Sequence, residues 1–289
     1  MIGKSYVTRC IPYVFILVAG WIVAAMPSDS AMAQRAERNG HEAKTVPEPL
    51  PAGVSADRVF AELVARNDAR TAALTEYRVS RTYQVIDLKG KVHAEIRGQM
   101  EYRAPGKKSF RVTSEAGSYL VRQLALHPLI TAEISAASGE EHRDSSFTPT
   151  NYTLDLLGQE QIGPSLCYVA QAIPRRKDKY LFEGKVWIDA RDYAIVRIEG
   201  HPARRLSFWI QQADILRQYE NFNGFWLPEE DKTVVDVRLY GKHIVAIVYR
   251  DYAVVPAAYK ASVVPDSIES GAFHSARPVG TSPSTEAQR

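Results

Sequence analysis

A hydrophobic pattern with a period of two, which starts at Tyr77 and continues with interruptions to about residue 256, constrains the fold more than any other feature. Its first segment places four apolar side chains on one face of an extended chain: Tyr77, Val79, Tyr83 and Val85. Such alternation is typical of an antiparallel strand that is buried on one face only. Followed along the chain, the pattern predicts roughly ten strands, mostly joined as consecutive hairpins in one antiparallel meander.

Two segments have helical spacing instead. Ser55 is expected to cap a helix that runs to about Ala73, because its side chain can accept a backbone hydrogen bond from the first turn. Residues 117–138 form the second helical segment, which Pro128 is expected to kink or divide, since proline removes a backbone donor. The predicted fold class is therefore α+β and mainly β, with a strongly curved sheet and helices against its concave face.

The first 33 residues have the pattern of a signal peptide. Lys4 and Arg9 precede an apolar run over residues 11–26, and Ala31 and Ala33 provide the small side chains that signal peptidase accepts. We therefore expect export and cleavage after Ala33. A retained membrane helix is the weaker alternative, because the run is short. The expected parts of the chain are a signal peptide (1–33), a flexible linker (34–54), one folded domain (55–256) and a disordered tail (257–289).

Composition and motif content argue against several classes of function. The net charge is only +3 and the basic residues are dispersed, so the sequence does not favour nucleic-acid binding. The seven histidines lack metal-binding spacing, and we find no nucleophile–base pair and no glycine-rich cradle, so no catalytic residue, metal or cofactor is expected. Once the signal peptide is removed, Cys167 is the one remaining cysteine, and it should pack as a small hydrophobic side chain.

Two hairpins carry a family resemblance: GKVWIDARDYAIVRIEG (184–200) and NGFWLPEEDKTVVDVRLYG (223–241). The motif residues are Trp187-Ile188-Asp189, Asp192, Arg197-Ile198-Glu199, Gly224, Trp226, Leu227 and Pro228. In these positions the chain resembles the periplasmic lipoprotein-sorting proteins of the LolA/LolB kind and their relatives of the RseB/MucB kind. Asp189 and Asp192 flank a tight turn and are expected to cap it through their side chains, with a catalytic carboxylate pair as the less favoured alternative.

The resemblance covers about residues 56–255. It implies a LolA-like unclosed half β-barrel, eleven-stranded in the family, whose hollow is covered by helices. It also implies periplasmic binding of lipoprotein acyl chains or other envelope lipids, without covalent chemistry, and exchange with a membrane-bound donor or acceptor protein. Two alternatives stay open. One is a regulatory module of the RseB kind, in which lipid occupancy changes binding to a protein partner, and the other is a hydrolase of envelope lipid or glycan.

A hollow for an acyl chain needs apolar side chains on the concave face of the sheet. Strand parity and side-chain size give nine candidates: Tyr83, Val85, Met100, Tyr102, Phe110, Trp187, Phe208, Ile210 and Trp226. Each could equally be an ordinary core residue beneath the helices. In carriers of the family an arginine often precedes the proline of the turn before the third strand and holds the lid closed. Here Ala104 precedes Pro105, which predicts a hollow that is open more of the time.

Overall fold

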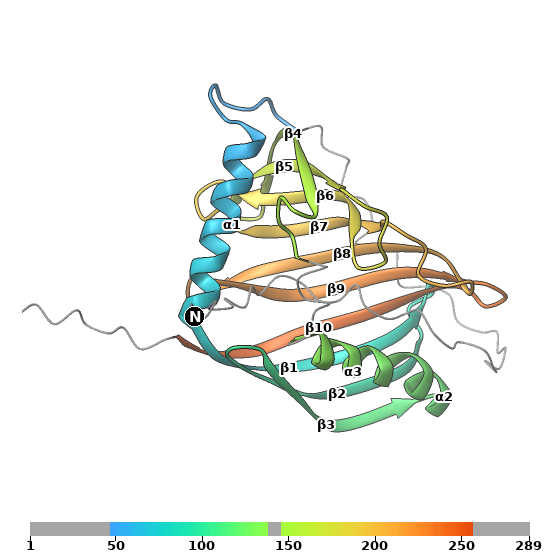
Figure 1. The fold of residues 1–289 in the computed structure, drawn as a ribbon. Coiled ribbons are helices and arrows are strands. Elements are labelled where there is room, and N and C mark those ends of the chain that lie inside the picture. The colour runs from blue at the N-terminus through green and yellow to red at the C-terminus, as the bar shows by residue number, and fades with distance from the viewer. Residues whose placement is uncertain (1–46, 138–145, 257–289) are drawn as a thin grey trace, which may run out of the picture. The chain divides into compact units, whose positions relative to one another are not determined.

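The computed structural model describes residues 47–137 and 146–256, in which helices lie on one face of a ten-stranded antiparallel sheet (Figure 1). The signal peptide, the expected tail and most of the expected linker lie outside the described residues. The helical elements are α1 (Ala56–Ala73), α2 (Tyr119–Val121), the π-helix η1 (Arg122–Leu126) and α3 (His127–Ala136). The strands are β1 (Leu74–Asp87), β2 (Val92–Arg103), β3 (Lys107–Gly117), β4 (Tyr152–Ile162), β5 (Ser165–Pro174), β6 (Phe182–Asp189), β7 (Ile195–Pro202), β8 (Ile210–Phe222), β9 (Phe225–Val237) and β10 (Gly241–Pro256).

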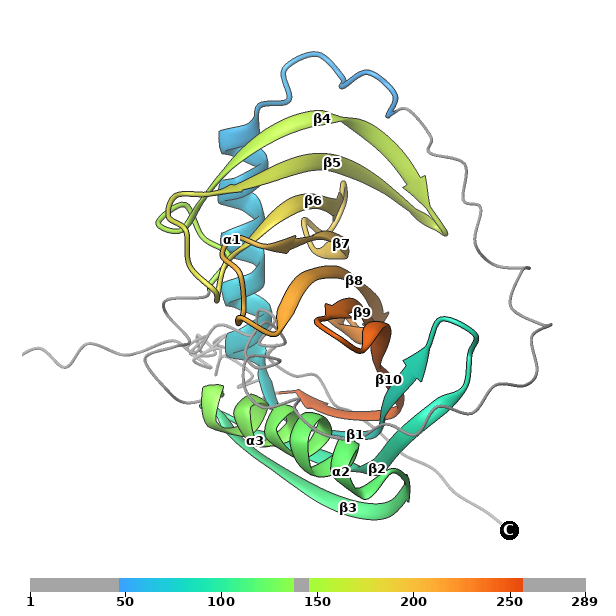
Figure 2. The same cartoon turned by 90° about the vertical axis from the view of Figure 1, so that its right-hand side faces the viewer.

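The strand order is β3-β2-β1-β10-β9-β8-β7-β6-β5-β4. The ten strands and their hairpins confirm the predicted elements. The prediction that they form one continuous meander is wrong, because β1 pairs with β10 and leaves β3 and β4 at opposite edges. The helical elements α2, η1 and α3 lie between β3 and β4 in the sequence and cover part of the concave face (Figure 2). Since β3 and β4 do not pair, the sheet is an unclosed half-barrel, as predicted. The family's eleventh strand has no counterpart within residues 47–137 and 146–256.

Helix α1 packs against the half of the sheet formed by β4 to β7 (Figure 1). Ser55 caps it as predicted, since its side chain accepts a hydrogen bond of 3.3 Å from the backbone N–H three residues later. The helix buries three apolar side chains against these strands: Val59, Phe60 and Leu63. Near its C-terminal end, the guanidinium of Arg70 donates to the backbone carbonyls of Asp192 (2.9 Å) and Tyr193 (3.2 Å). These bonds hold the end of α1 on the β6–β7 turn.

The β6–β7 turn is capped by Asp189, as predicted. Its Oδ1 accepts hydrogen bonds from the backbone N–H groups of Arg191 (2.9 Å) and Asp192 (2.8 Å). Asp192 has a different role from the one predicted, because its Oδ2 accepts from Trp226 Nε1 (2.9 Å) and Asn221 Nδ2 (3.2 Å). The motif residues of the two hairpins therefore join the β6–β7 turn to the β8–β9 hairpin, which is a structural role.

Pro128 divides the second helical segment, as predicted. It lies in the first turn of α3, where its missing N–H interrupts the regular hydrogen-bond ladder, and the turn before it widens into η1. The large apolar side chains Leu126, Leu129 and Ile130 of this segment are buried in the core against the sheet. Neither this segment nor α1, the helices that the structure describes, is long and apolar enough to cross a membrane.

Candidate functional site

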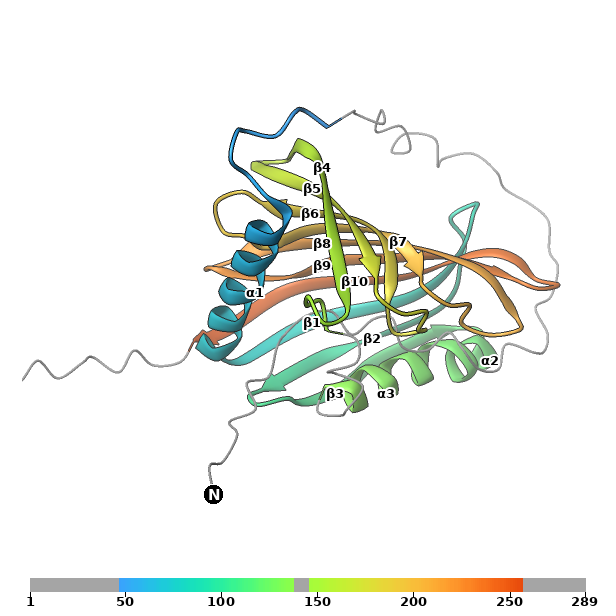
Figure 3. The same cartoon turned by 45° about the horizontal axis from the view of Figure 1, so that its top comes forward.

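The segment Tyr119–Ala136, which we call the helical cover, lies over the concave face of β1, β2 and β3 (Figures 2 and 3). The apolar core beneath it also receives side chains from β8, β9 and β10. In the sequence the cover follows β3, which is one edge strand, and precedes β4, which is the other. It therefore closes a hollow whose walls come from segments far apart in the sequence.

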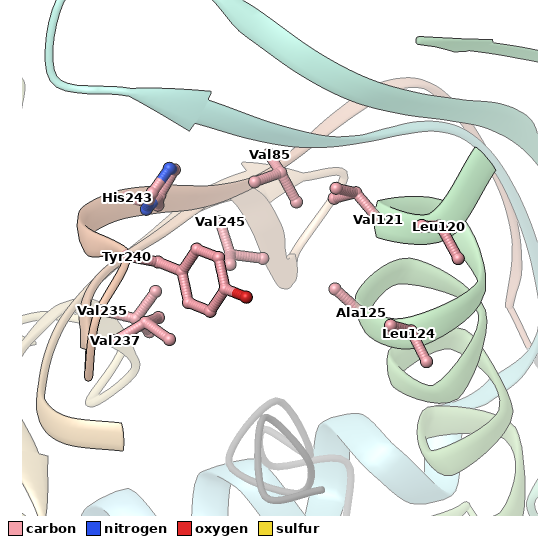
Figure 4. A pocket seen from close by; sticks show the side chains of 10 residues that line it. All are labelled: Val85, Leu120, Val121, Leu124, Ala125, Val235, Val237, Tyr240, His243 and Val245. Atoms are coloured by element: carbon pink, nitrogen blue, oxygen red, sulfur yellow. The ribbon is translucent and has the colours of Figure 1, made fainter. Parts of the chain in front are cut away.

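An apolar cleft opens between the N-terminal half of the cover and the β9–β10 hairpin (Figure 4). Its lining consists of Val85, Leu120, Val121, Leu124, Ala125, Val235, Val237, Tyr240, His243 and Val245. The hydroxyl of Tyr240 and the imidazole of His243 are the polar side-chain groups of this lining. The free volume of the cleft is about 30 Å³, which is room for about two water molecules. The structure thus shows a closed state, in which an acyl chain could enter only if the cover moved.

The C-terminal half of the cover is held by a buried ionic cluster, which we call the cover cluster. Glu133 of α3 accepts hydrogen bonds at 2.6 Å from Arg81 Nη1 and at 2.9 Å from Lys108 Nζ. The hydroxyl of Tyr83 donates to the same carboxylate at 3.2 Å. The side chains of Arg81 and Glu133 are 2% and 6% exposed, so water contributes little to their solvation. One carboxylate of the cover is therefore bound by cations from two strands, β1 and β3.

The charges in the cover cluster perturb each other's ionisation. Burial by itself would raise the pKa of Glu133, but the neighbouring positive charges of Arg81 and Lys108 outweigh it and hold that pKa well below its usual range. Burial would likewise lower the pKa of Lys108, but the charge of Glu133 dominates and raises it. All three groups are therefore ionised at neutral pH.

A second, exposed contact attaches the start of the cover to the edge strand β3. The carboxylate of Glu115 accepts from Arg122 Nε at 3.1 Å and lies 2.9 Å from His127 Nε2. Arg122 Nη1 also donates to the carbonyl of Gly117 at 2.6 Å. The side chain of Glu115 is 30% exposed, and ion pairs in contact with water stabilise a fold by about 1 kcal/mol or less. Removing one partner from the buried attachment at Glu133 would cost more, about 3–5 kcal/mol.

A further buried ion pair lies on the same face of the sheet, beside the cover cluster. Arg217 of β8 forms a bidentate pair with Asp231 of β9, and the hydroxyl of Tyr249 donates to Asp231 Oδ2 at 2.5 Å. The guanidinium carbon of Arg81 lies 4.7 Å from the centre of the Tyr249 ring, so this ring links the two groups of charges. The hollow therefore has an apolar region at the cleft and an ionic region under α3.

Six of the nine candidate residues lie together in the core under the cover: Tyr83, Val85, Met100, Tyr102, Phe110 and Ile210. Val85 also lines the cleft. Tyr83 and Met100 have no exposed surface, and the ring of Phe110 packs edge-on against Tyr83 with 5.4 Å between the ring centres. The structure therefore brings these six residues to the concave face, where strand parity predicted them.

The structure does not bring Trp187, Trp226 or Phe208 to the hollow. Trp187 packs on the opposite face of the sheet, because its neighbours in β6 face α1 and side chains alternate along a strand. There its Nε1 donates to Glu160 at 2.8 Å, and Trp226 packs against the same small cluster, as does the fully buried Cys167. Phe208 lies in the β7–β8 turn and is 61% exposed.

The attachment of the cover at Glu133 was not predicted from the sequence. Ala104 offers no charged group to the cover. The charged contact that the structure shows instead joins Glu133 to Arg81 and Lys108. One signal was present, since Arg81 occupies the parity of the apolar residues Val79 and Tyr83. A charged residue in an apolar register indicates a buried partner.

The fold and the site together define a class: a half-barrel whose hollow is closed by a helical cover. No protein-family model and no curated protein matches the chain. Among solved structures, a LolA superfamily protein from Nitrosomonas europaea matches with a TM-score of 0.38 and 13% identity over 70% of this chain and 94% of that chain. An outer membrane lipoprotein-sorting protein domain from Vibrio parahaemolyticus matches with a TM-score of 0.38 and 13% identity over 69% and 93%.

The MucA/MucB complex of Pseudomonas aeruginosa matches more weakly, with a TM-score of 0.26 and 12% identity over 68% of this chain and 93% of that chain. The structural neighbours are thus of the kinds that the hairpin motifs resemble. Likenesses at this level say nothing about ligand or activity. The function must be argued from the cleft, the cover and the charges beneath it.

Proposed function

We propose that this protein is a periplasmic binding protein that takes an acyl chain of a lipoprotein or another envelope lipid into the hollow under the helical cover. The observation that carries this proposal is the apolar cleft at the junction of the cover and the β9–β10 hairpin (Figure 4). The cleft borders the apolar core of β1, β2 and β10, so a ligand in the cleft could extend inward as the cover moves. No covalent step is part of the proposal.

The energy scale supports ligand-coupled opening. Moving the cover would expose Leu126, Leu129 and Ile130, at a cost of about 1.5–3 kcal/mol each. An acyl chain that takes their place recovers about 0.8 kcal/mol for each buried methylene, so a chain of about ten methylenes regains a free energy of the same size. A short-chain ligand would not compensate, which favours long acyl chains as the ligand class.

A fluorescent long-chain fatty acid, used below its critical micelle concentration, tests the proposal. Ala125→Phe and Val235→Phe would fill the cleft from its two walls, and we expect each to weaken probe binding about tenfold or more. Ala116→Phe on the exposed strand β3 is the matched control and should bind as the parent does. Equal probe affinity in all four proteins would show that the cleft does not hold acyl chains.

A regulatory role is the second candidate, favoured by the contact between the cover and an edge strand. Glu115 of β3 binds Arg122 and His127 of the cover, so opening would release one side of β3. Within the described residues β3 is at the edge of the sheet, where an extended peptide can add as a further strand. A protein partner whose capture from envelope extracts changes with added fatty acid would support this role, whereas capture independent of fatty acid would argue against it.

A further inference from the structure

The two ends of the sheet differ sharply in the residues of their hairpin turns. One end has the turns 104–106, 163–164, 190–194 and 223–224, whose charged residues are Arg191 and Asp192. The other end, which we call the basic rim, has the turns 88–91, 175–181, 203–209 and 238–240. These four turns contain nine lysines and arginines, namely Lys89, Lys91, Arg175, Arg176, Lys177, Lys179, Arg204, Arg205 and Arg238, and a single acidic residue, Asp178. The weak net charge of the chain thus conceals a strong local asymmetry, and the basic residues that are dispersed in the sequence gather at this end of the sheet.

Large apolar side chains project from the same end. Leu239 is 86% exposed, Phe208 is 61% exposed and Leu88 is 56% exposed, each in a different turn of the basic rim. Leu239 also has φ of +72°, a conformation that suits glycine or asparagine far better than leucine. The geometry of the β9–β10 turn therefore does not explain why leucine occupies position 239. A function for its exposed side chain would.

The turns that bear these side chains are neighbours. The backbone N–H of Arg238 donates to the carbonyl of Trp209 at 2.8 Å, and the guanidinium of Arg238 lies 4.3 Å from the centre of the Phe208 ring. Pairing of Asp87 with His243 places the β1–β2 turn next to the start of β10. Tyr240, which follows Leu239 in the β9–β10 turn, lines the cleft, so this turn of the basic rim lies at the cleft (Figure 4).

We propose that the basic rim docks on an anionic lipid surface, with Leu239 and Phe208 inserted at the depth of the headgroups. Each of these apolar side chains stands on a separate turn beside a cation: Leu239 follows Arg238, Leu88 precedes Lys89, and Phe208 is in contact with Arg238. This arrangement suits a headgroup layer that admits apolar side chains one by one while the cations bind lipid phosphates. A protein interface would instead favour one continuous apolar patch. Docking in this orientation would bring the opening of the cleft to the membrane. This inference goes beyond the proposed function and does not require a ligand in the cleft.

Vesicle flotation with the mature full chain tests the inference, using phosphatidylcholine vesicles with and without phosphatidylglycerol. We expect binding to the phosphatidylglycerol vesicles that weakens about tenfold without the anionic lipid and falls as salt is raised. The double variant Leu239→Asn/Phe208→Asn should also lose about tenfold or more, and asparagine suits the backbone at position 239. The matched control is Leu157→Asn/Leu166→Asn, two exposed leucines on β4 and β5.

A charge pair completes the test. Arg204→Gln/Arg205→Gln should weaken binding and reduce its salt dependence, whereas Arg191→Gln/Lys107→Gln at the opposite end should leave both unchanged. Equal binding to both vesicle types would overturn the inference. A Leu239→Asn/Phe208→Asn variant that binds as the parent does would also overturn it. A parent dimer that becomes monomeric in the Leu239→Asn/Phe208→Asn variant would overturn it too, because a second copy of the chain would then cover Leu239 and Phe208. Fatty-acid binding separates acyl-chain binding in the cleft from docking of the basic rim. The Leu239→Asn/Phe208→Asn variant should retain fatty-acid binding, and Ala125→Phe should still dock on vesicles.

Discussion

Replacing Glu133 with glutamine would keep the volume of the side chain and remove the charge that binds the cover. In the closed state, Arg81 and Lys108 would then lie buried at hydrogen-bond distance from a neutral amide. Removing one partner of a buried ion pair costs about 3–5 kcal/mol, most of it from the charge left without a counter-ion. Opening of the cover returns both cations to water, so the variant destabilises the closed state far more than the open one.

Two measurements follow from this difference. Hydrogen exchange of the amides of the cover should accelerate by about 100- to 4,000-fold, while that of the amides of β5 and β6 should change little. Association of a fluorescent fatty acid should also be faster if opening precedes binding. Glu115→Gln is the matched control, because it removes a carboxylate from the same cover at an exposed site and should cost about 1 kcal/mol or less.

The same cluster gives a pH dependence with a defined sign. Because the pKa of Glu133 is depressed in the folded protein, its ionised form stabilises the fold above the pKa of an unfolded glutamate, about 4.3, and this stabilisation is lost as the pH falls further. The difference in unfolding free energy between the parent and Glu133→Gln should be constant above about pH 5 and shrink below it. A difference that is equal for Glu133→Gln and Glu115→Gln, or that grows as the pH falls, would refute the reasoning.

Three further predictions concern other parts of the chain. Trp187→Ala should cost about 3–5 kcal/mol of stability in urea unfolding and leave fatty-acid affinity unchanged, since Trp187 packs on the face opposite the hollow; weakened affinity with little loss of stability would contradict this placement. Burial, with the charges of Asp189 and Glu160, raises the pKa of Cys167 to about 12, so a thiol reagent should label it only after denaturant is added, and labelling of the native protein would be inconsistent with the structure. N-terminal sequencing of the exported protein should find Gln34 first, and retention of Met1 in membrane fractions would show that the signal peptide is not cleaved.

Features that depend on residues close together in the chain were predictable. Ser55, Pro128 and Asp189 act through backbone groups a few positions away, and each behaves as its residue type and position indicated. Alternation of apolar side chains likewise identified the strands and placed six candidate residues on a common face. A period of two does not say which face is concave, however. Trp187 was assigned to the hollow although its neighbours in β6 face α1.

What the sequence by itself determined is therefore the set of elements, their caps and the two faces of each strand. The tertiary structure alone decided that β1 pairs with β10, that the helical cover lies over the concave face, and that Glu133 meets Arg81 from 52 positions away. Local patterns constrain backbone conformation and side-chain direction, which depend on near neighbours. Pairing between distant strands and between buried charges depends on which surfaces meet when the whole chain closes, and no segment of the sequence carries that information alone.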